Sequence, residues 1–157
     1  MAGGAPHGEI WLMRVLLDTN ILLDVLLNRA PWATEAAAVW KAHDEERIAG
    51  YIGATTIPDI FYVARRLVGL DSANKAIRIC LSTFDICTVD RRALQAAAAL
   101  SGSDFEDNLQ IACAILATLD AIVTRDSTGF RTTLIPALTP ADLLSRIPSG
   151  GENASTT

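Results

Sequence analysis

The order of its apolar segments constrains the fold of this chain more than any other feature. Short runs rich in β-branched residues alternate with longer segments in which apolar residues recur at helical spacing. The expected strands are 14–17, 48–52, 85–89, 121–124 and 133–135; the expected helices are 21–27, 34–44, 58–67, 72–83, 91–100, 104–118 and 140–147. This alternation implies parallel strands, because parallel neighbours need crossover connections that usually contain a helix. We therefore predict an α/β protein, a three-layer α/β/α sandwich with a central, mostly parallel sheet.

The chain has the length and composition of one folded domain. It has 157 residues, of which 50% are hydrophobic and 20% charged, enough to bury a sizeable core without resembling a disordered protein. Residues 13–147 contain all the expected elements. We expect residues 1–12 to form a flexible leader, and the small, polar residues 148–157 to form a disordered tail.

Cysteine usage and hydropathy bear on where the protein works. Cys80, Cys87 and Cys113 are odd in number and lack metal-ligand spacing, which favours reduced core residues. The best candidate for a membrane span, 111–123, is interrupted by Asp120 and falls short of the roughly 18 apolar residues required. The first residues also lack the basic start and long apolar centre of a secretory signal. We expect a cytoplasmic protein that does not enter the membrane.

The net charge of −5 excludes one class of function and leaves another open. It argues against a protein that coats nucleic acid with a broad basic face. It does not exclude an enzyme whose carboxylates are offset by a bound metal, because a divalent ion can reverse the local sign of the field.

Two carboxylates lie at or shortly after the ends of expected strands. In VLLDTNILLD, residues 15–24, an apolar run ends in Asp18, and a carboxylate at the edge of a core is costly to bury unless a cation meets it. Asp126 follows the apolar run 121–123 after two intervening residues. If both strands are parallel in one sheet, both carboxylates reach the edge beyond the strand ends, where such sheets bind ligands.

A third carboxylate stands near the start of a helix. In ATTIPDIFYVARRL, Thr55 or Thr56 can cap the helix and Pro58 suits its first turn, so Asp59 lies close to the helix start. Asp59 also lies one turn before Val63 on the border of the apolar stripe, which directs it toward the edge of the core.

Two further carboxylates begin the helix in SGSDFEDNLQIACAIL. Ser103 and Glu106 fit a capping box, with the helix beginning at about Asp104. Asp104 and Asp107 are three residues apart and therefore share one helix face. Because short loops place helix starts at the carboxyl edge of a parallel sheet, all four acidic segments are expected to converge.

Each acid alone has an ordinary explanation. Asp18 and Asp126 can cap the next helix, and Asp59, Asp104 and Asp107 can complement helix dipoles. Together they would repel one another and raise some pKa values unless a cation shared the space. Oxygen ligands without histidine or thiolate suit Mg²⁺ or Mn²⁺. We predict that all five aspartates bind the metal, and that Asp18, Asp59, Asp107 and Asp126 are catalytic.

The four acidic segments resemble those of the PIN domain family. LLDTNILLDVLLNR, TTIPDIFYVARR, SDFEDNLQIACA and IVTRDSTGF follow one another in the family's order, and the resemblance spans about residues 13–147. It maps the family's first, third and fourth metal-binding acids onto Asp18, Asp107 and Asp126. The second acid, often a glutamate, falls on Asp59, whose side chain is shorter, and Asp104 matches an extra acid of some members.

The resemblance implies a PIN-like nuclease domain over residues 13–147. It implies an Mg²⁺- or Mn²⁺-dependent endoribonuclease, often a homodimer. In many prokaryotic members such a protein is the toxin of a VapBC-type pair, whose partner is a small antitoxin protein. Carboxylate-held metal is compatible with this chemistry, because it can activate a water, place it in line with an RNA phosphodiester and stabilise the developing charge.

Several other side chains lie close to the acidic segments. Thr19, Asn20 and Ser127 are expected either to orient ligands or substrate or to cap helices. The arginines near the site are candidates for phosphate contacts or for a solvated surface, and they are Arg29, Arg65, Arg66, Arg125 and Arg131. Asp24 falls about 240 degrees round the helix from Asp18 and is left outside the site.

Two other functions remain open from the sequence. A receiver-type phospho-acceptor also puts an aspartate at a strand end beside Mg²⁺, but it usually needs a strand-end lysine, and Lys41 and Lys75 lie in helical segments. A PIN-like fold that has lost catalysis could act as a binding or assembly module. The nearly complete acid set favours an active enzyme.

Overall fold

The computed structural model describes residues 12–127, 130 and 134–149. Its strands are β1 (Met13–Leu17), β2 (Ile48–Gly53), β3 (Asp85–Cys87), β4 (Ala121–Val123) and β5 (Ala137–Leu138). Its helices are α1 (Thr19–Leu26), α2 (Ala33–Asp44), α3 (Thr56–Val68), α4 (Leu70–Thr83), α5 (Arg91–Ala98), α6 (Phe105–Leu116) and α7 (Pro140–Arg146). Most of the predicted leader (1–12) and tail (148–157) lies outside the described residues, so the domain limits stay predictions.

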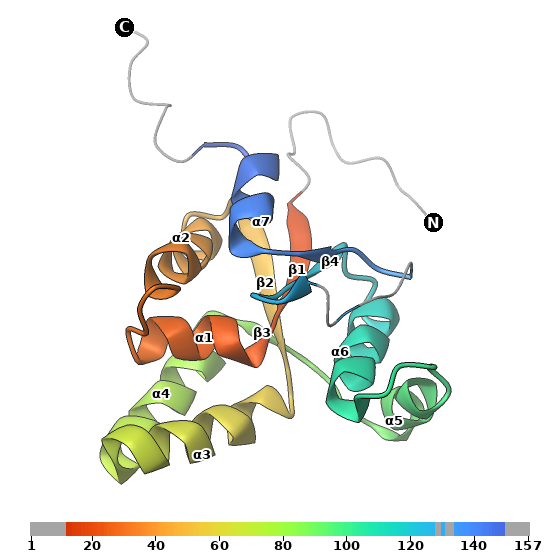
Figure 1. Ribbon diagram of the computed structural model, residues 1–157, viewed down its shortest axis with the longest axis horizontal. Helices are drawn as coiled ribbons and strands as arrows, with labels where there is room; N and C mark the ends of the chain where they lie inside the picture. Colours follow the sequence, from red (N-terminus) through yellow and green to blue (C-terminus); the bar gives the residue numbers. More distant parts are fainter. Residues whose placement is uncertain (1–11, 128–129, 131–133, 150–157) are drawn as a thin grey trace, which may run out of the picture.

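The strands form one five-stranded sheet in the order β3-β2-β1-β4-β5 (Figure 1). All four strand pairings are parallel. β1 lies at the centre, where Leu16 is in register with Tyr51 of β2 and Leu17 with Val123 of β4. The prediction of a mostly parallel sheet is confirmed.

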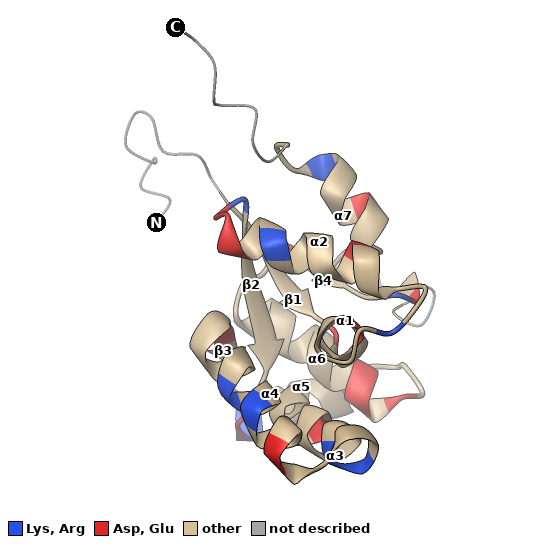
Figure 2. Ribbon diagram, turned by 90° about the vertical axis from the view of Figure 1, so that its left-hand side faces the viewer, with Lys and Arg blue, Asp and Glu red and all other residues tan. Residues whose placement is uncertain are grey.

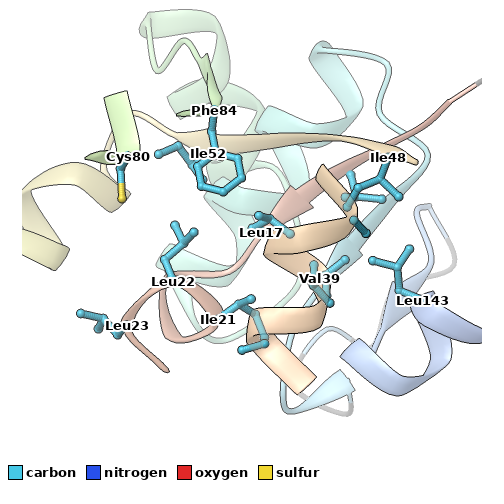
Figure 3. Packing of buried hydrophobic residues seen from close by; sticks show 14 of the residues in the cluster. Leu17, Ile21, Leu22, Leu23, Val39, Ile48, Ile52, Cys80, Phe84 and Leu143 are labelled. Atoms are coloured by element: carbon cyan, nitrogen blue, oxygen red, sulfur yellow. The ribbon is translucent and has the colours of Figure 1, made fainter. Parts of the chain in front are cut away.

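Helices cover both faces of the sheet, because the side chains of β1 alternate between two apolar clusters. Val15 and Leu17 belong to the larger cluster, which α1, α2, α3, α4 and α7 cover and Figure 3 shows in part. Leu16 belongs to the second cluster, which α5 and α6 cover. In Figure 1 these two helices lie on one side of the sheet and the others on the opposite side. The predicted three-layer α/β/α sandwich is confirmed.

Local sequence signals place some of the helix ends. The hydroxyl of Thr139 accepts a hydrogen bond from the backbone N–H of Asp142 at 3.2 Å, and Pro140 occupies the first turn of α7. Gly69, between α3 and α4, has a φ of 93°, a left-handed conformation that glycine adopts without strain. The helix containing Asp59 begins at Thr56, two residues before the predicted start.

The predicted fifth strand, 133–135, was wrong. Leu134 and Ile135 form a bend, residue 133 lies outside the described residues, and the strand is Ala137–Leu138. Pairing with Ile122 and Val123 of β4 decides where β5 runs. Ile135 is nevertheless buried in the second cluster, so its apolar side chain indicated burial and not extended pairing.

The three cysteines are free and buried, as predicted. Burial raises the pKa of Cys80 and Cys87 to about 11, which keeps both thiols protonated at neutral pH. Among the helices of the described residues, none is both long and apolar enough to cross a membrane.

Candidate metal centre

The first and last of the predicted acids meet where the strand order reverses. The chain passes from β1 to β2 on one side, while β4 pairs with β1 on the other, so β1 and β4 flank the switch point of the sheet. Asp18 follows β1, and its backbone N–H bonds to the carbonyl oxygen of Val123 at 2.9 Å. Asp126 follows β4 along the same edge. The predicted convergence of these two strand ends is present.

Asp18 does not use its side chain to cap α1, although it occupies the N-cap position. Its Oδ1 accepts a hydrogen bond from Gln110 Nε2 at 3.0 Å, and its Oδ2 accepts one from Thr124 Oγ1 at 2.9 Å. Two neutral donors therefore orient the Asp18 carboxylate, and the metal ion expected beside it stays a prediction. Each carboxylate oxygen keeps lone pairs for a further ligand.

Gln110 and Thr124 are site residues that sequence reasoning missed. Gln110 lies three residues after Asp107 in α6 and therefore on the same face, so helical spacing contained a signal. Thr124 follows β4 directly, and its register beside Asp18 depends on which strands pair.

Asp104 is the N-cap residue of α6 and Asp107 lies in its first turn. Figure 2 colours the acidic residues of the described chain red. Asp104, not Ser103, caps the helix, and its Oδ1 accepts the N–H of Asp107 at 3.1 Å. Burial, together with the negative charges of Asp104, Asp18, Glu106 and Asp126 in that order, raises the pKa of Asp107 to about 6. These acids therefore share one electrostatic field.

Asp59 occupies a more separate position. It lies in the first turn of α3, where burial alone raises its pKa, and it is not among the charges that shift Asp107. The hydroxyls of Thr19 and Thr56 are nevertheless 3.1 Å apart, which joins the start of α1 to the start of α3. Asp59 thus begins a helix anchored beside Asp18, and its role as a ligand stays a prediction.

The predicted phosphate-binding arginines divide into two groups. Arg29 and Arg125 both form ion pairs with Asp24, so their guanidinium groups are engaged inside the protein. Arg65 and Arg66 are exposed in the last turn of α3. Arg131 lies outside the described residues.

The chemistry of the acid set fits a divalent cation. Over residues 12–127, 130 and 134–149, no group of three or more His, Cys, Asp or Glu residues is already arranged to hold a metal. After burial, the negative charges of Asp104 and Asp18 contribute to the raised pKa of Asp107, and carboxylates that repel one another need a cation to draw closer. The donors are all oxygen atoms, which Mg²⁺ and Mn²⁺ prefer.

Fold and site together define an α/β protein with a carboxylate centre at the switch point of a parallel sheet. The sequence profile of the family described as PIN domain matches residues 14–128. The chain therefore belongs to the PIN domain family. This membership argues against the receiver-type alternative. Among curated proteins, no sequence matches the chain.

Solved structures of toxin–antitoxin proteins share the fold. One from a toxin–antitoxin complex of Klebsiella pneumoniae has a TM-score of 0.62 at 24% identity, over 80% of this chain and 97% of that one. FitAcB from Neisseria gonorrhoeae has a TM-score of 0.61 at 17% identity, over 81% of this chain and 98% of that one. VapC20 from Mycobacterium tuberculosis, a sarcin–ricin loop cleaving toxin, has a TM-score of 0.55 at 16% identity, over 69% of this chain and 86% of that one. At these identities the likeness shows the fold alone.

Proposed function

We propose that this protein is an Mg²⁺- or Mn²⁺-dependent endoribonuclease. One observation carries the proposal: the Asp18 carboxylate, after β1, accepts hydrogen bonds from Thr124 after β4 and from Gln110 of α6, which brings together the three segments that contain Asp18, Asp126 and Asp107. Membership of the PIN domain family, whose members are typically nucleases, supports the same activity.

Asp18, Asp107 and Asp126 would hold the metal, with Asp104 and Asp59 as further ligands. Bound Mg²⁺ or Mn²⁺ supplies Lewis acidity toward water and offsets charge on the phosphate. Gln110 and Thr124 fix the orientation of the Asp18 carboxylate through their hydrogen bonds. The cap made by Asp104 orders the first turn of α6 and so positions Asp107.

RNA cleavage tests the proposal directly. The purified protein is incubated with end-labelled RNA that contains single-stranded and hairpin-loop segments, with Mg²⁺, Mn²⁺ or EDTA. The expected result is discrete cuts that need the metal and disappear in Asp18→Asn. Equal cutting by the parent and the variant contradicts the assignment, because it locates the activity in another site or a contaminant.

The alternative function is a binding module without catalytic activity. It stays open because Asp59 has a shorter side chain than the glutamate often found at this position in the family. Calorimetric titration with Mn²⁺ separates the two functions. An active centre binds Mn²⁺ more tightly than the Asp18→Asn, Asp107→Asn double variant, whereas an inactive module binds no better than that control.

We further propose a protein partner for the turn between α3 and α4. Leu67, Val68 and Leu70 are 58%, 50% and 49% exposed there, and apolar side chains clustered at one turn favour a contact surface. A second copy of the chain is the expected occupant, and a small antitoxin is the other candidate partner.

Light scattering should find a dimer that Leu67→Glu converts to monomer. A reading frame for a small protein directly upstream would support the antitoxin.

A further inference from the structure

A second aspartate of the first motif is completely buried. Asp24 lies in α1, six residues after Asp18, and its relative exposure is 0%. Its Oδ1 lies 2.9 Å from Arg29 Nε and 3.1 Å from Arg125 Nη2, and its Oδ2 lies 2.8 Å from Arg125 Nε. Arg125 therefore meets the carboxylate with two nitrogens: Nη2 donates a hydrogen bond to Oδ1, whereas Nε and Oδ2 are in ion-pair contact without a hydrogen bond within the described residues.

Each arginine reaches from Asp24 toward the candidate metal centre. Arg29 Nη2 donates to Asn20 Oδ1 at 3.2 Å, two residues after Asp18. Arg125 lies between Thr124, which bonds to Asp18, and Asp126. The backbone N–H of Asp126 in turn donates to Thr124 Oγ1 at 3.3 Å. Residues 124–126 are thus held by Asp18 on one side and by Asp24 on the other.

Trp32 restrains the same guanidinium group from another direction. The Arg125 guanidinium carbon stands 3.8 Å from the centre of the Trp32 ring, within the range of a cation–π contact. The turn that carries Trp32 is tied back to Asp24, because the Arg29 N–H bonds to the Asp24 carbonyl at 3.0 Å and the Trp32 N–H bonds to the Arg29 carbonyl at 3.1 Å. Arg125 is therefore held by its contacts with Asp24 and by its stacking on Trp32.

Stability alone is a weak reason for this arrangement. Taking charges out of water is costly, and apolar residues of similar volume often stabilise a core as well or better. What the ion cluster supplies, and an apolar core would not, is a directional link from the interior of α1 to residues 124–126. An ion cluster can serve positioning in this way.

We propose that Asp24 is a positioning residue of the metal centre, which fixes Asp126 through Arg125 and Asn20 through Arg29. The inference rests on the proposed function for its link to metal binding. The part of the inference that concerns structure is that Arg125 immobilises the backbone at Asp126. This part depends only on the contacts within the protein. Arg125→Met removes only the contact between Asp24 and residue 125 and leaves Asp24 paired with Arg29.

The test compares Arg125→Met with Glu45→Gln, which disrupts the surface ion pair between Arg47 and Glu45. Three experiments are compared: backbone amide exchange at Asp126 without metal, Mn²⁺ affinity by calorimetry, and RNA cleavage kinetics that give kcat and KM. Arg125→Met should speed exchange at Asp126 and weaken Mn²⁺ binding about tenfold, as removal of an outer-shell partner commonly does. It should lower kcat while KM changes less than about twofold, because a misplaced ligand impairs the chemical step. Glu45→Gln should match the parent in all three.

Arg125→Lys keeps the positive charge without the planar guanidinium that contacts both Asp24 oxygens and should give intermediate exchange at Asp126 and intermediate Mn²⁺ affinity. It also carries the test if Arg125→Met does not fold. Unchanged exchange at Asp126 together with unchanged Mn²⁺ affinity in both variants overturns the inference. If the parent itself neither binds Mn²⁺ nor cuts RNA, the proposed function fails, and the exchange rates alone then decide whether Asp24 and Arg125 hold Asp126.

Discussion

The hydroxyl of Thr124, directly after β4, donates a 2.9 Å hydrogen bond to Oδ2 of Asp18, directly after β1. The same hydroxyl oxygen accepts the backbone N–H of Asp126. One small side chain therefore sets the position of two predicted metal ligands. The two ligand segments are coupled before any metal enters.

Thr124→Val should remove this coupling while keeping the shape of the side chain. We expect about 1 kcal/mol lower free energy of unfolding and about tenfold weaker Mn²⁺ binding. Urea unfolding and calorimetry measure the two effects. Thr83→Val is the matched control, because its hydroxyl bonds only to the Ile79 carbonyl within α4. Mn²⁺ affinity that is unchanged in Thr124→Val would show that the hydroxyl does not position the ligands.

Asp107 should make the protein less stable as pH rises. Its folded pKa of about 6 lies above the ordinary 3.8, so the folded state holds the proton more tightly than the unfolded chain. The free energy of unfolding therefore falls as pH rises from about 4 to about 6 and stays lower above that.

Asp107→Asn should abolish this loss. After a discount for solvent screening, the free energy of unfolding of Asp107→Asn should exceed that of the parent by on the order of 1 kcal/mol at neutral pH. This difference should vanish below about pH 4. Urea unfolding across this pH range measures it. Asp142→Asn, in the first turn of α7, should keep the slope of the parent. The raised pKa predicts that, from pH 4 to pH 6, the parent loses stability relative to Asp107→Asn. If the parent gains as much stability as the variant over this range, or more, the raised pKa is contradicted.

Asp104 is predicted to bind metal and is observed to cap α6, and substitutions separate the two roles. Asp104→Ser keeps a capping oxygen and should change stability by less than about 0.5 kcal/mol, whereas Asp104→Ala should cost about 1 kcal/mol. Both should weaken Mn²⁺ binding, because the acid set loses one charge. Parental Mn²⁺ affinity in Asp104→Ser would reduce Asp104 to a cap.

Gly50 in β2 should tolerate no side chain. A Cβ there would lie 3.0 Å from Phe84 Cδ1 and 3.2 Å from His43 Nδ1, which itself accepts the Gly50 N–H. Gly50→Ala should therefore cost about 1–3 kcal/mol by overpacking. Gly53→Ala, in the same strand, meets only Thr55 and Thr56 at 3.9 Å and should be neutral or stabilising. Equal thermal unfolding midpoints for the two variants would contradict this packing.

The fold was predictable because its signals are local. Hydrophobic period and helix signals located seven helices and four of the strands to within about three residues, as expected of strongly patterned segments. The fifth strand escaped because two residues carry little pattern, and the position of Ala137 is decided by pairing with Ile122. Asp104 was expected inside the helix because Ser103 offered an equally good cap on sequence grounds.

The candidate site was predictable only in part. Strand ends and helix starts placed the acids along one edge, since a parallel sheet aligns them. The partners of those acids depend on long-range contacts: Gln110 is 92 residues from Asp18, and Arg125 is 101 residues from Asp24. Helical spacing kept Asp24 outside the acid set, yet no local pattern indicated that it would be completely buried between two arginines.

Diffraction from crystals grown with Mn²⁺ tests the central claim most directly, because anomalous scattering locates the ion without any assumption about activity. The account predicts a Mn²⁺ peak in contact with the carboxylates of Asp18 and Asp126, with Asp107 beside it, and no such peak in Asp18→Asn. A parent crystal whose Mn²⁺ peaks all lie away from Asp18 would contradict it.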